Sequence, residues 1–181
     1  MQDVVIVSAS RTAIGSYGGT LKSTPVMDLG AVVLKETLKK IDTRPVVTEE
    51  CINFGADRLR DQGKIELELE HDDYDSGNQP VMVDQVIMGN VIGAGQGQNV
   101  TRQAMIKAGI PKETCATSVN KICASGMEAV ALAYQAIRSG DSQVVLAGGM
   151  ECMSMIPYAL PTTRWGQRMG DGQIVDLMVY D

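Results

Sequence analysis

Thr117–Gly140 has the sequence TSVNKICASGMEAVALAYQAIRSG, which predicts a strand, a turn and an amphipathic helix. The first six residues, Thr117–Ile122, are rich in β-branched side chains, as strands are. Ser125 and Glu128 have the spacing of a capping box, in which each side chain accepts a hydrogen bond from a backbone N–H of the first helical turn. Apolar residues follow at helical spacing, and Gly140 is suited to end the helix in the left-handed conformation.

Cys123 falls at the turn, just before the predicted helix. The unpaired N–H groups and the positive end of a helix dipole stabilise an anion, so a thiol at such a place has its pKa lowered from about 8.5 toward neutrality. The small residues Ala124, Ser125 and Gly126 leave room for a bulky substrate to reach the sulfur. The alternative is an inert buried thiol, which is common for cysteine. Cys123 is therefore the candidate nucleophile, and the spacing alone leaves both interpretations open.

The composition predicts one soluble α/β domain. With 181 residues, 44% of them hydrophobic, the chain is long enough for a sizeable core. Its net charge of −6 argues against a nucleic-acid partner, and no run is long enough to span a membrane. The four cysteines form no CxxC pair and no metal-ligand spacing with the single histidine, His71. We therefore expect no metal, and reduced thiols in a cytoplasmic protein.

Strand-like and helix-like segments alternate along most of the chain. The predicted strands are Val4–Ala9, Val83–Val91, Thr117–Ile122 and Gln143–Gly149. Helices are expected after each of the first three: one capped by Thr24 with Pro25 at its first position, one capped by Asn99, and the helix after Cys123. The order βαβαβαβ predicts a mostly parallel sheet with helices on both faces. Active residues of such sheets gather where strands end and helices begin, which is where Cys123 lies.

Asp42–Pro80 differs from the rest of the chain in charge. Eleven acidic and four basic residues give it a charge of −7, which leaves +1 for the remainder. Within it, KIELELE (residues 64–70) alternates like a half-buried strand, and a turn-rich loop follows. Several side chains here are able to bind a divalent cation, but their order does not match a calcium loop and a solvated acidic surface is the better interpretation. They are Asp57, Asp61, His71, Asp72, Asp73 and Asp75.

The loop GAGQGQN (residues 93–99) begins like a dinucleotide-binding fingerprint. Gln98 stands where the third glycine is required, so that prediction fails. A tight or interface-forming loop is the better interpretation.

Four segments together resemble the N-terminal half of the thiolase family, most closely the biosynthetic acetyl-CoA acetyltransferases. They are VVIVSASRTAIGSYGGTLKSTP (4–25), VDQVIMGNVIGAGQGQNVTRQA (83–104), NKICASGMEAVALAYQAIRSGDSQVVLAGGMECMS (120–154) and RWGQRMGDG (164–172). The resemblance implies a three-layer thiolase domain over residues 1–150, with an insertion at about 42–80. Residues 151–181 would begin the loop domain that carries the coenzyme A contacts and tetramer contacts. The fifth strand and the C-terminal half of the family are absent from this sequence.

The resemblance also implies the chemistry. Cys123 would take an acetyl group from acetyl-CoA as a thioester and pass it to the enolate of a second acetyl-CoA, giving acetoacetyl-CoA and coenzyme A, or catalyse the reverse thiolysis. The backbone N–H of Cys123 would help to hold the oxyanion. Coenzyme A thioesters are then substrates and no cofactor is bound permanently; the residues that bind them are not identified. Gln98 and Asn99 resemble the family's stretch at the dimer interface, so a homo-oligomer is expected.

The departures from the family are as informative. The family activates its nucleophile with a histidine in a GHP segment and uses a second cysteine in a CxGGG segment, and neither segment is present. We therefore expect the chain alone to be inactive and to need a C-terminal thiolase half. The alternative is a non-enzymatic binding or scaffolding fragment that uses the acidic insertion. A different cysteine enzyme, such as a hydrolase, finds no supporting histidine outside Asp42–Pro80.

Overall fold

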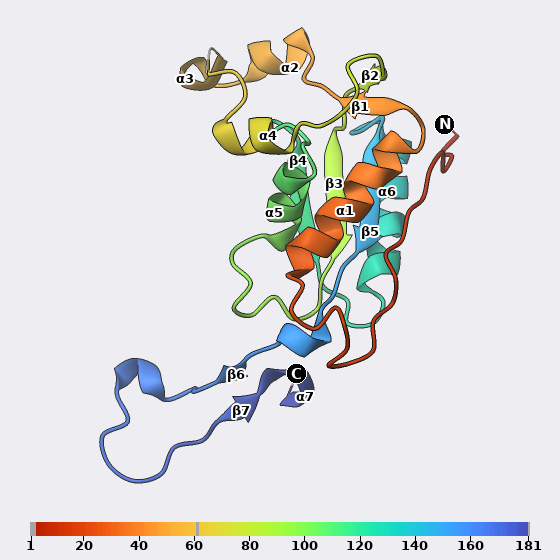
Figure 1. Cartoon of the computed structure of the whole chain (residues 1–181). Helices are drawn as coiled ribbons and strands as arrows, with labels where there is room; N and C mark the ends of the chain where they lie inside the picture. Colours follow the sequence, from red (N-terminus) through yellow and green to blue (C-terminus); the bar gives the residue numbers. More distant parts are fainter. Residues whose placement is uncertain (1–2, 61, 181) are drawn as a thin grey trace.

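The computed structural model describes residues 3–60 and 62–180, and its centre is a three-stranded parallel sheet. Strands β3 (Gln85–Gly89), β4 (Cys115–Val119) and β5 (Val145–Gly149) lie in the order β4-β3-β5. Gln85 is opposite both Cys115 and Val145, so the three strands start and end together. Their carboxyl ends therefore meet at one end of the domain (Figure 1).

Helices cover both faces of the sheet. Helices α1 (Val26–Lys39) and α5 (Val100–Lys107) pack against each other on one face, and α6 (Ser125–Ser139) lies on the other (Figure 1). The core between the sheet and the α1–α5 layer is built from aliphatic and methionine side chains. Its most buried members include Val26, Leu34, Leu38, Val83, Val86, Met88, Ala104, Met105 and Ile110. The predicted three-layer α/β class is confirmed.

Most of the predicted elements are present, with shifted ends. Strands β3 and β5 lie inside the predicted ranges, but β4 begins and ends earlier than the predicted Thr117–Ile122. The pairing of β4 with β3 ends at Val119, opposite Gly89, and a turn with Ile122 and Ala124 follows. Helix α1 begins one residue later than predicted: Pro25 is its N-cap, and no side chain caps it.

The predicted first strand, Val4–Ala9, is wrong for this structure. The segment belongs to no strand, and Val5, Ile6 and Val7 are between 71% and 83% exposed. Backbone N–H and C=O groups of a strand need a neighbouring strand, and among the described residues β5 pairs only with β3. An apolar, β-branched sequence is therefore not sufficient to form a strand where no neighbouring strand pairs with it.

The acidic segment folds into short helices between a pair of short strands. Strands β1 (Thr43–Pro45) and β2 (Gln79–Val81) pair in parallel and enclose α2 (Glu49–Phe54), α3 (Asp57–Arg60) and α4 (Glu66–His71). This group lies at the amino ends of the main strands (Figure 1). KIELELE is thus mostly helix and not the predicted strand. Glutamate and leucine favour helices, and Glu68 accepts a hydrogen bond from the N–H of Ile65 at 2.7 Å, which begins the helix.

Helix α4 is attached to the body of the domain through Glu68. This side chain is only 2% exposed, and its Oε1 accepts a hydrogen bond from the N–H of Lys112 at 2.7 Å. Asp73 pairs with Lys35 at 2.7 Å and Lys39 at 3.2 Å. The segment is therefore docked, and only part of its charge forms the solvated surface that the sequence predicted. Asp61, one of the residues considered for a cation, lies outside the described residues.

Beyond β5 the chain forms an arm that extends away from the sheet (Figure 1). It contains η1 (Met153–Met155), η2 (Thr163–Trp165), the antiparallel pair β6 (Tyr158–Ala159) and β7 (Val175–Asp176), and α7 (Leu177–Tyr180). The division near residue 150 stays a prediction. None of the helices formed by residues 3–60 and 62–180 has the length and apolar character needed to cross a membrane.

Candidate functional site

The turn between β4 and α6 carries the candidate nucleophile. Cys123 is exposed and stands two residues before the first residue of α6, Ser125. It therefore lies where the sequence predicted, at the carboxyl end of the sheet and beside a helix N-terminus. Its exposure argues against the alternative of an inert buried thiol.

Two strand-ending glycines bring the start of α6 close to the sheet. A Cβ on Gly89 would lie 2.4 Å from the carbonyl carbon of Ser125 and 2.5 Å from the nitrogen of Gly126. A Cβ on Gly149 would lie 3.2 Å from the Cα of Gly126. Side chains at these places would push the helix away, so the position of Cys123 depends on glycine at the ends of β3 and β5.

Ser125 holds the turn from the helix side. Its hydroxyl accepts a hydrogen bond from the N–H of Lys121 at 2.8 Å and donates one to the carbonyl of Ile122 at 2.6 Å. The predicted capping box is therefore wrong: Ala124 is the N-cap, no side chain caps the helix, and Glu128 forms an ion pair with Lys121 at 2.6 Å. The serine hydroxyl is used by the turn and is not the cap of the helix.

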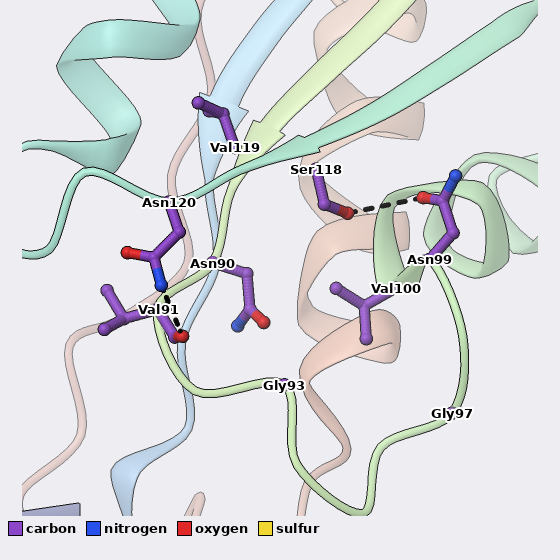
Figure 2. Close-up of a pocket in the computed structure, with 9 residues that line it drawn as sticks. All are labelled: Asn90, Val91, Gly93, Gly97, Asn99, Val100, Ser118, Val119 and Asn120. Atoms are coloured by element: carbon purple, nitrogen blue, oxygen red, sulfur yellow. Dashed lines mark hydrogen bonds between the residues drawn. The ribbon is translucent and has the colours of Figure 1, made fainter. Parts of the chain in front are cut away.

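Asn120 holds the turn from the strand side. Its Oδ1 accepts a hydrogen bond from the N–H of Ile122 at 2.9 Å. Its Nδ2 donates to the carbonyl of Val91, in the loop after β3, at 3.0 Å (Figure 2). One amide thus joins the turn that carries Cys123 to the loop after the neighbouring strand.

Glu151, just after β5, fixes that same loop. Its carboxylate accepts hydrogen bonds from the N–H of Val91 at 2.7 Å and from the side chain of Asn90 at 3.3 Å. The segments that follow all three main strands are therefore connected through hydrogen bonds. Sequence reasoning alone missed Asn90, Asn120 and Glu151, although each is a polar residue within two positions of the end of a predicted or observed strand.

A hollow of about 230 Å³ lies between these loops. Asn99 borders it in the left-handed conformation, with its Oδ1 accepting from the N–H of Arg102 at 3.0 Å and its Nδ2 donating to the carbonyl of Ala116 at 3.0 Å. The lining, drawn in Figure 2, consists of Asn90, Val91, Gly93, Gly97, Asn99, Val100, Ser118, Val119 and Asn120. The predicted helix cap at Asn99 is confirmed.

His71 does not belong to this site. It ends α4, at the amino ends of the strands, whereas α6 begins at their carboxyl ends (Figure 1). Within the described residues there is no group of three or more histidine, cysteine or acidic side chains that could hold a metal ion.

The comparisons with known proteins agree with this fold. The family model for the N-terminal domain of thiolases matches residues 4–55 and 74–181. The chain therefore belongs to the thiolase family. The match omits residues 56–73, which lie inside the predicted insertion and contain α3 and α4.

Similar individual proteins are bacterial acyltransferases. The chain is 43% identical over 181 residues to the acetyl-CoA acetyltransferase of Cupriavidus necator and 42% identical over 182 residues to that of Escherichia coli K12. It is 38% identical over 181 residues to a probable acetyl-CoA acyltransferase of Staphylococcus aureus. In each case all of this chain is covered, and it spans 37% of the length of the relative.

Proposed function

We propose that this chain is the nucleophile-bearing N-terminal part of an acetyl-CoA C-acetyltransferase. Cys123 accepts an acetyl group from acetyl-CoA and passes it to a second acetyl-CoA, or the same steps run in reverse as thiolysis. The observation that carries the proposal is the exposed Cys123 on the turn between β4 and α6, in a chain that belongs to the thiolase family.

The first half-reaction is a thioester exchange. The Cys123 thiolate attacks the acetyl carbonyl carbon, a tetrahedral oxyanion forms, and the coenzyme A thiolate leaves as the C–S bond to it breaks. The backbone N–H of Cys123 is a donor to that oxyanion. In the second half-reaction the enolate of another acetyl-CoA attacks the acetyl-cysteine, and the cysteine thiolate is released.

The groups that activate the thiol and form the enolate are supplied by other residues. The resemblance assigns these roles to a histidine and a second cysteine in segments that this sequence does not contain. We therefore expect the 181-residue chain to be inactive by itself and active together with a C-terminal thiolase half.

A homo-oligomer is the second part of the proposal. Strand β4 is at the edge of the sheet, and its sequence, CATSV, contains no charged residue and no proline to prevent further strand pairing. Asn99 contacts this strand through the carbonyl of Ala116, so the loop that resembles the family's interface stretch lies beside it. Pairing of two β4 edges about a two-fold axis would give a symmetric dimer.

Labelling and activity assays test the function. The purified chain, alone or mixed with the C-terminal part of the Cupriavidus necator relative, is incubated with acetyl-CoA. We expect acetoacetyl-CoA from the mixture only, and acetyl on the peptide that contains Cys123. Full activity of the chain without any partner would contradict the proposal.

The acidic insertion supports a second candidate, a binding surface for a basic partner. Phe54 is 84% exposed, and Leu69 is exposed on α4, the helix that also carries Glu66 and Glu70. A lysine-rich peptide with apolar residues is a suitable probe, because salt screens such an interaction. We expect it to bind the chain at low salt and to lose binding when the whole acidic segment, Asp42–Pro80, is deleted. Unchanged binding by the deletion variant would contradict this candidate.

A further inference from the structure

Ile122, the residue before Cys123, has an unusual backbone conformation. Three described non-glycine residues have a positive φ, namely Asp42, Asn99 and Ile122, and Ile122 has φ 52°. Aspartate and asparagine tolerate this left-handed region, whereas a β-branched side chain at positive φ is a genuine outlier. The Ile122 side chain is 69% exposed, so burial in the core does not compensate for the strain.

Hydrogen bonds from both sides hold Ile122 in place. Asn120 Oδ1 accepts from its N–H at 2.9 Å, and the hydroxyl of Ser125 donates to its carbonyl at 2.6 Å. Ser125 is only 4% exposed and is part of α6. The backbone N–H of Ile122 is thus held by Asn120, which follows β4, and its carbonyl is held by Ser125 at the start of α6.

The second hydrogen bond of Asn120 ties the turn to a rigid support. Its Nδ2 donates to the carbonyl of Val91 at 3.0 Å, and the N–H of Val91 donates to Glu151 at 2.7 Å. A primary amide both accepts and donates, whereas an ionised aspartate only accepts. Asparagine is therefore the residue type that makes both contacts at this position.

We propose that Asn120 is a positioning residue for the nucleophile: it holds Ile122 in the left-handed conformation and thereby directs Cys123 at the start of α6. Strain of this kind persists where the surrounding structure over-determines it, and it is concentrated at functional sites. The inference rests on the proposed role of Cys123 as the nucleophile, but its test does not require acetyl transfer.

The test measures the rate at which iodoacetamide alkylates Cys123, followed on the peptide that contains it. Asn120→Ala removes both hydrogen bonds, so Ile122 is free to relax to negative φ and Cys123 moves from the helix start. We expect the rate to fall on the order of tenfold, because each of the two lost hydrogen bonds is worth a factor of roughly 2 to 10. Asn53→Ala, an exposed change in α2, is the matched control and leaves the rate unchanged.

Ile122→Gly distinguishes positioning from a merely structural role. Glycine adopts positive φ without strain, so the double variant Asn120→Ala with Ile122→Gly should recover part of the rate that Asn120→Ala loses. Asn120→Asp, which keeps the acceptor for Ile122 but loses the donor to Val91, should be intermediate. If Asn120→Ala does not fold, the double variant and Asn120→Asp still give the comparison.

Two results would overturn the proposal: a parental alkylation rate in Asn120→Ala, or no recovery in the double variant. Acetylation from acetyl-CoA, measured on the same variants together with the C-terminal part, separates the two claims. If the parent is acetylated but the alkylation rates of the variants do not follow the expected order, only the positioning role is contradicted. The expected alkylation pattern without any acetylation of the parent contradicts the proposed function alone.

Discussion

The two ends of the sheet use polar side chains in different ways. At the carboxyl end, Asn120, Ser125 and Glu151 bond to backbone groups of neighbouring loops and so define one turn. At the amino end, Glu68 and Asp73 bond to groups of the domain body and attach an extra segment to it. The same kind of hydrogen bond thus shapes a site at one end and docks an appendage at the other.

The family match follows this difference. It includes the whole carboxyl end and omits residues 56–73 at the amino end. We therefore expect changes at the carboxyl end to alter Cys123, and changes in the insertion to leave it unaffected.

The largest expected effect is that of Gly89→Ala. The new Cβ would lie 2.4 Å from backbone of α6, which is unable to move without disturbing the turn. Overpacking of this kind costs about 1–3 kcal/mol, measured as the free energy of unfolding in urea. We also expect slower alkylation of Cys123.

Gly77→Ala is the matched control at the amino end. Its Cβ would meet only the Asp75 side chain, at 3.4 Å, so the free energy of unfolding should change by less than about 0.5 kcal/mol. Equal losses from the two substitutions would contradict the close packing of α6 on β3.

Removing the Glu68 side chain should sharpen the contrast between the two ends. Glu68→Ala leaves the N–H groups of Ile65 and Lys112 without this partner, which costs about 1–3 kcal/mol. Hydrogen exchange should become faster across residues 42–80, while alkylation of Cys123 stays at the parental rate.

Glu66→Ala removes an exposed carboxylate from the same helix. It should change neither the hydrogen exchange of residues 42–80 nor the alkylation rate of Cys123. A slower alkylation of Cys123 in Glu68→Ala would show that the two ends are coupled and would contradict their independence.

The smallest effect is expected at Asp73, and it depends on pH. Hydrogen bonding to Lys35 holds the pKa of this carboxyl below its usual value. Because the folded-state pKa is the lower one, the stabilisation is present above the unfolded pKa and is lost as pH falls through the folded pKa. Asp73→Asn should therefore destabilise more at pH 7 than at pH 2, and by less than about 1 kcal/mol because the Asp73 side chain is 60% exposed.

Urea titrations at the two pH values measure this difference. A loss of the same size at both would mean that the charge of Asp73 does not contribute.

The elements that the sequence predicted well have local signals. Asn99 at the start of α5 and Gly140 at the end of α6 act through backbone groups a few residues away. Strands β3 and β5 are apolar runs bounded by polar residues and glycine. Each of these signals is complete within a short window, so neighbours distant in sequence do not change it.

The wrong predictions depend on distant partners. Val4–Ala9 has the composition of a strand but no neighbouring strand among the described residues. KIELELE alternates over too few residues to outweigh helix propensity, and the buried Glu68 accepts a hydrogen bond from Lys112, which is 44 residues away. Ser125 has the spacing of a cap, but its hydroxyl bonds to the turn that precedes the helix.

The surroundings of Cys123 were predicted in part. Cys123 follows from its place before a helix, whereas the turn that holds it depends on Asn120 reaching Val91 across the sheet and on positive φ at Ile122. Neither the contact between Asn120 and Val91 nor the positive φ of Ile122 can be predicted from the amino-acid sequence. Glycine at the ends of β3 and β5 was a usable signal, because close approach of a helix requires it.

The most direct test of Cys123 as the nucleophile is mass spectrometry of the peptide that contains it, after incubation with acetyl-CoA and the C-terminal part of a relative. Cys115→Ser, which changes another exposed thiol, is the control variant. We expect acetyl on Cys123 in the parent and in Cys115→Ser, and both should form acetoacetyl-CoA. Adding Cys123→Ser to either protein should abolish acetoacetyl-CoA formation. Acetoacetyl-CoA formed at the parental rate by Cys123→Ser would contradict this role of Cys123.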